Sequence, residues 1–172
     1  MQDQEIGLAR GLRQGDAFAD AIALNVILPT GSSSSSPALG VGYAAVEPDY
    51  EFGVKRNFGV RAAFGSFSFG PRIFLNSGVT QLRATAEVGT RLYRTLDVFG
   101  TLFASRTFGI DHATSLMQNP NAAEDYNLIR GGIGVRLALS KSVRPLIEYE
   151  TDIAGQAIHA GSRVLIGFSW HY

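Results

Sequence analysis

The stretch VTQLRATAEVGTRLY, at residues 79–93, alternates between two kinds of side chain with a period of two residues. One set is mainly apolar: Thr80, Leu82, Ala84, Ala86, Val88, Thr90 and Leu92. The other set is polar, charged or glycine: Gln81, Arg83, Thr85, Glu87, Gly89 and Arg91. Successive side chains of a β-strand point to opposite faces. This period therefore predicts one long strand with an apolar and a polar face.

The same alternation recurs along the chain, at 50–54, 58–65, 129–139 and 143–152, and less cleanly at 97–108. Short connections near 13–16, 55–57, 94–96 and 140–142 alternate with long ones at 29–37, 70–78, 110–126 and 153–157. The pattern predicts eight strands, at 17–28, 38–54, 58–69, 79–93, 97–108, 127–139, 143–152 and 159–172. Strands joined in this way form an antiparallel up-and-down meander, and eight are enough to close into a barrel.

The predicted barrel domain covers residues 17–172, and residues 1–16 lie outside it. Those sixteen residues fit a periplasmic tail, a short helix or an extra strand, and the tail is the favoured interpretation. Nothing else in the sequence suggests a second domain, because the serine run at 32–36 is a low-complexity loop.

Composition excludes several classes of protein. The 172 residues carry 15 basic and 15 acidic side chains, so there is no basic excess for a nucleic-acid partner. The chain has no cysteine, which excludes a disulfide framework and a thiolate metal site. No apolar run approaches the roughly 20 residues of a membrane helix. A membrane location must therefore rest on strand alternation.

Alternation alone leaves open which face is inside. A soluble lipocalin-like barrel would put the apolar face in the lumen, whereas an outer-membrane barrel does the reverse. Three features favour the membrane. The charged face is arginine interleaved with small residues, and Lys55 and Lys141 are the only lysines. Turns are short at one end and loops long at the other. Aromatic residues gather near the short-turn end of the strands: Tyr50, Phe52, Phe58, Tyr93, Phe99, Trp170 and Tyr172.

Two strand–turn–strand units, GTRLYRTLDVFGTLFA and GIGVRLALSKSVRPLIEYE, resemble those of the small eight-stranded outer-membrane barrels of Gram-negative bacteria, the superfamily of the OmpA transmembrane domain and the opacity-type proteins. The last strand also resembles theirs, with Val164, Ile166, Phe168, Trp170 and Tyr172 at alternate positions. The resemblance implies a monomer in the bacterial outer membrane that contacts outer-membrane lipid and lipopolysaccharide. It also implies that the barrel-assembly machinery reads the last strand, in which Tyr172 stands where the family usually has phenylalanine.

On this orientation the polar faces form a network of arginines and carboxylates inside the barrel. Buried charges are tolerated when they are paired, and arginine offers a rigid fork to carboxylates. The predicted network contains Arg61, Arg83, Glu87, Arg91, Arg106, Arg130, Arg136, Arg144, Glu148, Glu150, Asp152 and Arg163, with Glu51, Asp20 and Glu47 as further acids. Its favoured interpretation is a plug of ion pairs that fills the lumen. The alternative is a narrow polar pathway with a slight preference for anions, from the arginine excess.

The expected function is therefore non-enzymatic: a structural or surface-interaction role through the long extracellular loops, above all 110–126. A narrow channel for small polar or anionic solutes is the alternative. A lipid A-modifying enzyme is the third possibility, because some members of the superfamily are enzymes. His112, His159 and His171 are the only histidines, and His159 and Ser162 fall on opposite faces of a strand, which prevents general-base geometry. We predict no catalytic residue, no metal site and no cofactor.

Overall fold

The computed structural model describes residues 4–30, 44–59, 61–75, 79–108, 127–140, 143–156 and 161–170. These residues form a single sheet of nine strands: β1 (Gln4–Gln14), β2 (Phe18–Leu28), β3 (Ala45–Phe58), β4 (Arg61–Phe74), β5 (Thr80–Tyr93), β6 (Leu96–Phe108), β7 (Asn127–Leu137), β8 (Val143–Gln156) and β9 (Ser162–Trp170). In this part of the chain no helix has the length and apolar character of a membrane span.

The strands follow one another in the sheet in chain order, and every neighbouring pair is antiparallel. The prediction of an all-β, antiparallel up-and-down topology is confirmed. Strands β2 to β9 correspond to the eight predicted strands. The predicted bounds at 38–43, 159–160 and 171–172, like the long loop 110–126, lie outside the described residues.

The count of eight strands is wrong by one, because residues 4–14 form strand β1 rather than a tail. This strand pairs with β2 along its whole length, from Gln4 opposite Leu28 to Gln14 opposite Ala19. Its sequence, QEIGLARGLRQ, places Ile6 and Leu8 on one face and Gly7 and Ala9 on the other. The alternation was therefore present in the sequence, although glycine and alanine make it weak.

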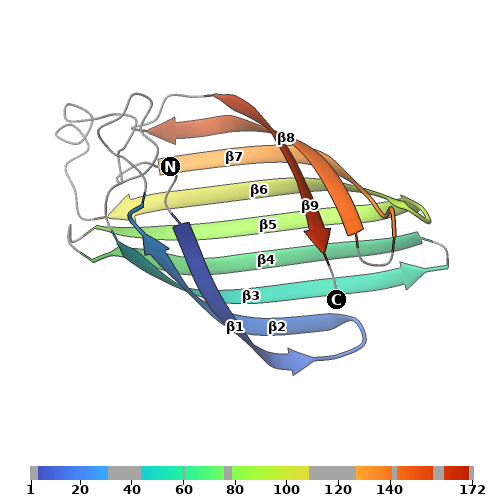
Figure 1. Cartoon of the computed structure of the whole chain (residues 1–172), viewed down its shortest axis with the longest axis horizontal. Coiled ribbons are helices and arrows are strands. Elements are labelled where there is room, and N and C mark those ends of the chain that lie inside the picture. The colour runs from blue at the N-terminus through green and yellow to red at the C-terminus, as the bar shows by residue number, and fades with distance from the viewer. Residues whose placement is uncertain are drawn as a thin grey trace.

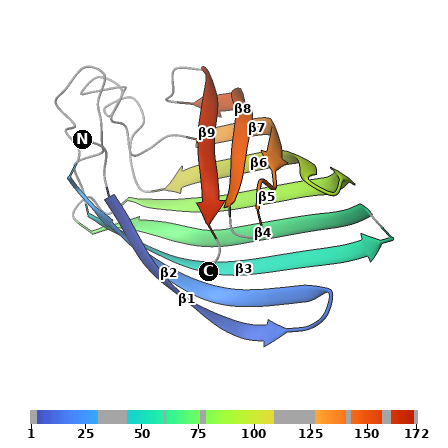
Figure 2. The same cartoon turned by 45° about the vertical axis from the view of Figure 1, so that its right-hand side comes forward.

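The sheet is strongly curled but its hydrogen bonding does not close. Figures 1 and 2 show both edge strands, β1 and β9, brought round to the same side of the middle strands. Each edge strand has only one neighbour in the sheet. Because neighbours alternate in direction, β1 and β9 run the same way. The short connections lie at one end of the strands, the right-hand end in Figure 1.

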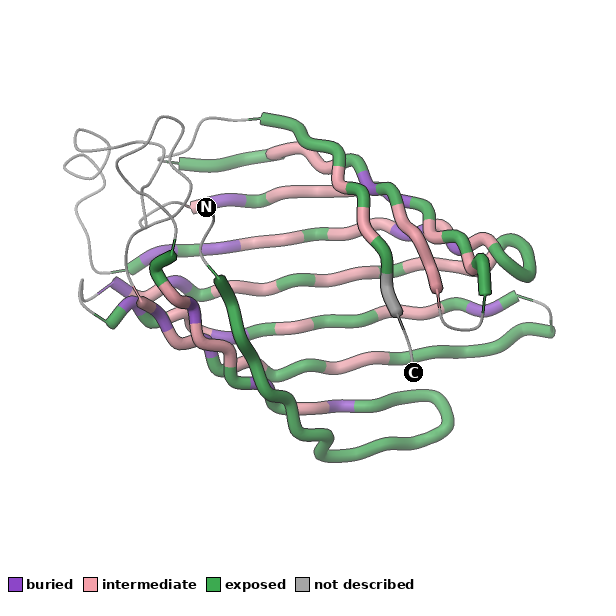
Figure 3. Tube along the Cα trace, in the orientation of Figure 1, coloured by how far each residue is buried: buried purple, intermediate pink, exposed green. Residues whose placement is uncertain are grey.

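Burial in this sheet is inverted relative to that of a water-soluble protein. The buried polar residues are Asp20, Glu47, Gln81, Asp97, Ser105, Thr107 and Glu148. Large apolar side chains are exposed instead, and examples are Val88 at 66%, Ile133 at 63% and Ile166 at 80%. Figure 3 shows exposed and less exposed residues alternating along the strands. The only cluster of buried apolar residues in the described chain is small: Ile27, Ala45, Phe74 and Val79.

The turn between β3 and β4 lies later in the chain than predicted. Strand β3 continues through Lys55-Arg56-Asn57, the predicted turn, and ends at Phe58, which pairs with Arg61. Gly59 occupies the turn with a φ of 62°, a left-handed conformation that glycine adopts without a steric penalty. The shift decides which face the first residues of β4 occupy, and it therefore bears on the predicted interior network.

Candidate functional site: the charged inner face

The register across the strands identifies one polar face. Paired residues share a face, so Gly53, Ser66, Glu87, Thr101, Gly132, Glu150 and Arg163 form one continuous row. The neighbouring row on the other face reads Val54, Gly65, Val88, Gly100, Ile133, Tyr149 and Val164. The first face is termed the inner face and the second the outer face, because ion pairs cover the former and exposed apolar side chains the latter.

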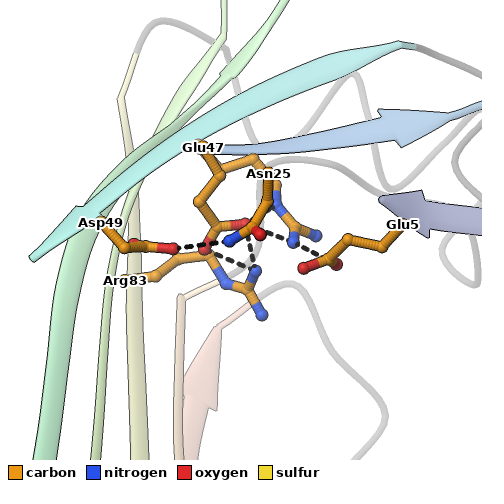
Figure 4. A network of polar contacts seen from close by, with 6 residues as sticks. Glu5, Asn25, Glu47, Asp49 and Arg83 are labelled. Carbon is orange, nitrogen blue, oxygen red and sulfur yellow. Dashed lines mark hydrogen bonds and ion pairs between the residues drawn. The ribbon is translucent and has the colours of Figure 1, made fainter. Parts of the chain in front are cut away.

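Glu47 is the centre of an ion cluster at the long-loop end of the inner face (Figure 4). Arg83 Nη1 donates to both carboxylate oxygens of Glu47, at 2.9 and 2.7 Å. Arg72 also donates to Glu47 and reaches Glu5 Oε2 at 3.1 Å. The Glu47 side chain is only 7% exposed. This carboxylate is therefore compensated by two guanidinium groups, as a buried charge requires.

Asp49 lies beside this cluster and is held by Asn25, whose Nδ2 donates to Asp49 Oδ2 at 3.0 Å (Figure 4). The Arg83 guanidinium carbon lies 5.0 Å from the centre of the Phe103 ring, within the range of a cation–π interaction. Strands β1 to β6 all contribute to this corner of the inner face. We refer to Glu5, Asn25, Glu47, Asp49, Arg72 and Arg83 as the Glu47 cluster.

Further ion pairs join neighbouring strands of the inner face, two of them toward the long-loop end and one beside the β5–β6 turn. Arg130 Nε donates to Asp152 at 2.6 Å, and Arg163 pairs with Glu150. Arg91 Nε donates to Asp97 at 2.8 Å across the β5–β6 turn. Each pair ties one strand to the next. These contacts fix register as well as compensating charge, because a slip of one residue would move one partner to the outer face.

A densely packed region covers β5 to β8 near the short turns, and we term it the packed wall. Arg136 reaches across from β7 to Glu87 on β5 at 3.2 Å, and its guanidinium carbon lies 4.8 Å from the centre of the Phe99 ring. The Phe99 ring lies so close over Gly134 that a Cβ added there would be 2.4 Å from it. Thr101 donates a hydrogen bond to buried Glu148. Little space remains between these groups.

The inner face of β1 to β3 is different, and we term it the small-residue wall. Its inward positions include Gly11, Ala19, Ala21 and Gly53. A cavity of about 630 Å³ opens over this wall and extends to β4 and β5. The polar side chains on its inner-face lining are Gln14, Glu51, Ser66, Ser68 and Thr85. The outer-face ion pair of Arg13 and Asp20 also lines the cavity, so Glu51 is the carboxylate in this lining that has no ion pair within the described residues.

Most residues of the predicted network share the inner face of the sheet. This group is Arg83, Glu87, Arg91, Arg130, Arg136, Arg144, Glu148, Glu150, Asp152 and Arg163. Arg144 forms no ion pair with a described residue, and its buried Nε has no hydrogen-bond partner within the described structure. Glu51 and Glu47 also belong to this face.

Arg61 and Arg106 were predicted to lie inside, and both lie on the outer face. Arg61 pairs with Phe58 beside the displaced β3–β4 turn, so the inward residues of early β4 are Ala62 and Phe64 instead. Arg106 pairs with Leu82, and its guanidinium carbon lies 5.5 Å from the centre of the Phe108 ring. Both arginines are exposed. Near strand ends an arginine can extend its charge toward the polar interface.

Asp20 also lies on the outer face rather than inside, because it pairs with the outer-face residue Phe52 of β3. It is nonetheless buried, because Arg13 Nε donates to it at 2.9 Å and the Tyr50 hydroxyl donates at 3.0 Å. Asp20 was among the predicted acids, but its partners Arg13 and Tyr50 were not predicted, nor were the inner-face residues Arg72 and Asp97. Extending the predicted strand at 58–69 to Phe74 would have included Arg72, but only the shifted β3–β4 turn puts the even-numbered residues of β4 on the inner face.

The described residues contain no group of three metal-ligating side chains. His112, His159 and His171 lie outside the described residues, as does Tyr172. In the predicted assembly signal, Val164, Ile166 and Phe168 are exposed on the outer face, and Trp170 is the last residue of β9.

Comparison with known proteins gives no family assignment. No protein-family model matches the chain, and no curated protein matches it.

Proposed function

We propose that the chain is a transmembrane β-barrel of a bacterial outer membrane, non-enzymatic, with its outer face in the lipid and its inner face directed to the lumen. The observation that carries this proposal is the inverted burial, in which Asp20, Glu47, Asp97 and Glu148 are covered while most large apolar side chains of the outer face are exposed. In water such an extended apolar surface would drive aggregation. In a bilayer the hydrocarbon chains of the lipid cover such a surface, as they cover the apolar band of a transmembrane barrel.

The proposal includes closure of the sheet, because a bilayer core offers no partner for an open strand edge. Two observations support closure between β1 and β9. Both edges curl to the same side of the sheet (Figure 2), and both carry apolar residues outward, such as Leu8 and Ile166. Since the two strands run in the same direction, their pairing would be parallel and the barrel would have nine strands.

Cysteine cross-linking in the membrane tests this closure, since the chain has no native cysteine. Leu8→Cys is combined in turn with Val164→Cys, Ile166→Cys and Phe168→Cys. One of these pairs is expected to form a disulfide under oxidation, whereas Leu8→Cys with Ile133→Cys is not. Absence of a cross-link in all three pairs would contradict closure through β1 and β9.

Membrane integration is tested by reconstituting the full chain in phospholipid vesicles and extracting them with alkaline carbonate. We expect the protein to remain with the floated vesicles and to change its gel mobility on heating, as a stable barrel does. A chain that carbonate releases and that stays monodisperse without detergent would contradict the proposal and favour a soluble barrel.

A narrow conduit for small polar solutes is a second candidate role, and the cavity over the small-residue wall favours it. If the ion pairs filled the whole lumen, no space of about 630 Å³ would remain on the inner face. The packed wall occupies one side and the cavity the other. Conductance in planar bilayers tests this role, and silent bilayers under conditions of verified insertion would contradict it.

A further inference from the structure

The charges on the inner face do not have the arginine excess that the sequence suggested. Arg61 and Arg106, both counted as interior, lie on the outer face. The inner face gains acids that the predicted network omitted or left as additions, notably Asp49, Glu51 and Asp97. An anion preference derived from an arginine count therefore no longer has a basis.

The arginines that remain inside are mostly neutralised by direct contact with carboxylates. This holds for Arg72, Arg83, Arg91, Arg130, Arg136 and Arg163. A cation bound to a carboxylate at about 3 Å presents little net field to a passing ion. The groups that remain able to select between ions are those without an opposite charge beside them.

Glu51 is such a group, and it faces the cavity. It is exposed, and none of the described basic residues forms an ion pair with it. Its direct neighbour across β3–β4 is Ser68, followed by Thr85 on β5. A carboxylate with adjacent hydroxyl oxygens offers a cation both charge compensation and replacement of part of its hydration shell.

The inner-face cations without a carboxylate partner in the described structure lie toward the short-turn rim instead. Lys55 is close to the end of β3, where it lines a separate hollow of about 310 Å³ together with Asp16. Arg144 is the second residue of β8. Neither Lys55 nor Arg144 lines the cavity of about 630 Å³, and the one basic residue in its lining, Arg13, is paired with Asp20, so Glu51 is the unpaired charge there.

We propose that the passage prefers small cations over anions, and that Glu51 is the residue that determines this selectivity. The inference rests on the proposed conduit and names the class of solute that this cavity takes. It does not depend on the loops or on the Glu47 cluster, in which arginines pair with Glu47 and Glu5 and Asn25 holds Asp49.

The test is the sign of the reversal potential of the full chain in neutral planar bilayers under a KCl gradient. Wild type is expected to give the sign of potassium selectivity. Glu51→Gln is expected to shift the potential toward zero, and Glu51→Lys to reverse its sign. Lys55→Gln is the matched control, because it removes a charge from the same strand and should leave the sign unchanged. Heat-modifiable gel mobility verifies that each variant has folded.

The outcomes separate the two proposals. Cation selectivity that Glu51→Gln weakens supports the inference. Anion-selective currents, or a cation selectivity that Glu51→Gln leaves unchanged, overturn it while the conduit stands. Silent bilayers from inserted, heat-modifiable protein overturn the conduit itself and the selectivity with it.

Discussion

The packed wall and the small-residue wall lie on the same inner face but differ in whether their charges are paired and in how densely their side chains pack. On the packed wall, Arg136 is held by Glu87 and lies against the ring of Phe99. On the small-residue wall, Glu51 has alanine, glycine and serine around it and forms no ion pair with a described residue, because Arg13 in the same lining pairs with Asp20. The contrast indicates that ion pairs tie the strands of the packed wall together, while Glu51 lies at a cavity without an ion-pair partner in the described residues.

The largest expected effect is the loss of the acid at the centre of the Glu47 cluster. Glu47→Ala leaves two largely covered guanidinium groups facing each other, and breaking a buried ion pair in this way costs about 3–5 kcal/mol. Denaturant unfolding in lipid vesicles measures the change in the free energy of unfolding. Glu51→Gln serves as the comparison, with an expected change of at most about 0.5 kcal/mol. Equal losses of unfolding free energy in the two variants would show that the ion pairs of Glu47 do not stabilise the protein more than the unpaired Glu51 does.

A second prediction concerns the outer face, which both walls share. Val88 lies in the middle of β5 and is 66% exposed. If hydrocarbon covers it, Val88→Arg should destabilise the barrel by about 2–4 kcal/mol, as arginine does near the bilayer midplane. Leu92→Arg, near the short-turn end, should cost only about 0–1 kcal/mol. The same vesicle-based unfolding measurement applies, and a neutral Val88→Arg would argue for water at this face.

Substitutions at two glycines test whether the packed wall has less free space than the small-residue wall. A Cβ at Gly134 would lie 2.4 Å from the Phe99 ring and 2.9 Å from the Ile147 carbonyl oxygen, whereas one at Gly53 would have nothing closer than 3.9 Å. Gly134→Ala should therefore cost about 1–3 kcal/mol through overpacking. Gly53→Ala should stay within about 0.5 kcal/mol of wild type. If Gly53→Ala were as harmful, the small-residue wall would not be the open side of the interior.

The smallest effect is expected at the edge of the sheet. Arg163 on β9 pairs with Glu150, but its side chain is 52% exposed. Exposed ion pairs contribute about 0–1 kcal/mol, so Arg163→Gln should change the free energy of unfolding by no more than that. A loss comparable to that of Glu47→Ala would mean that closure of the barrel buries this pair.

Strand alternation predicted the topology and most of the inner face, because period two is strong where one face is consistently apolar, as at Leu82 and Val88. It failed where local chemistry moved a turn. The left-handed Gly59 shifted the β3–β4 turn and placed Arg61 outside. It also failed at Arg106, because β6 has apolar residues on both faces and the sequence does not show which alternate positions point inward. The partners of each arginine depend on cross-strand register, which a single sequence does not specify.

The orientation of the two faces is tested most directly by nitroxide labels at an inner and an outer position of the same strand, which the absence of cysteine permits. Val88→Cys and Thr85→Cys are labelled separately in vesicle-reconstituted protein, and collision with oxygen is compared with collision with a water-soluble nickel chelate. We predict that the label at position 88 meets mainly oxygen and the label at position 85 mainly nickel. The reverse pattern, with nickel reaching position 88 and oxygen position 85, would contradict the account.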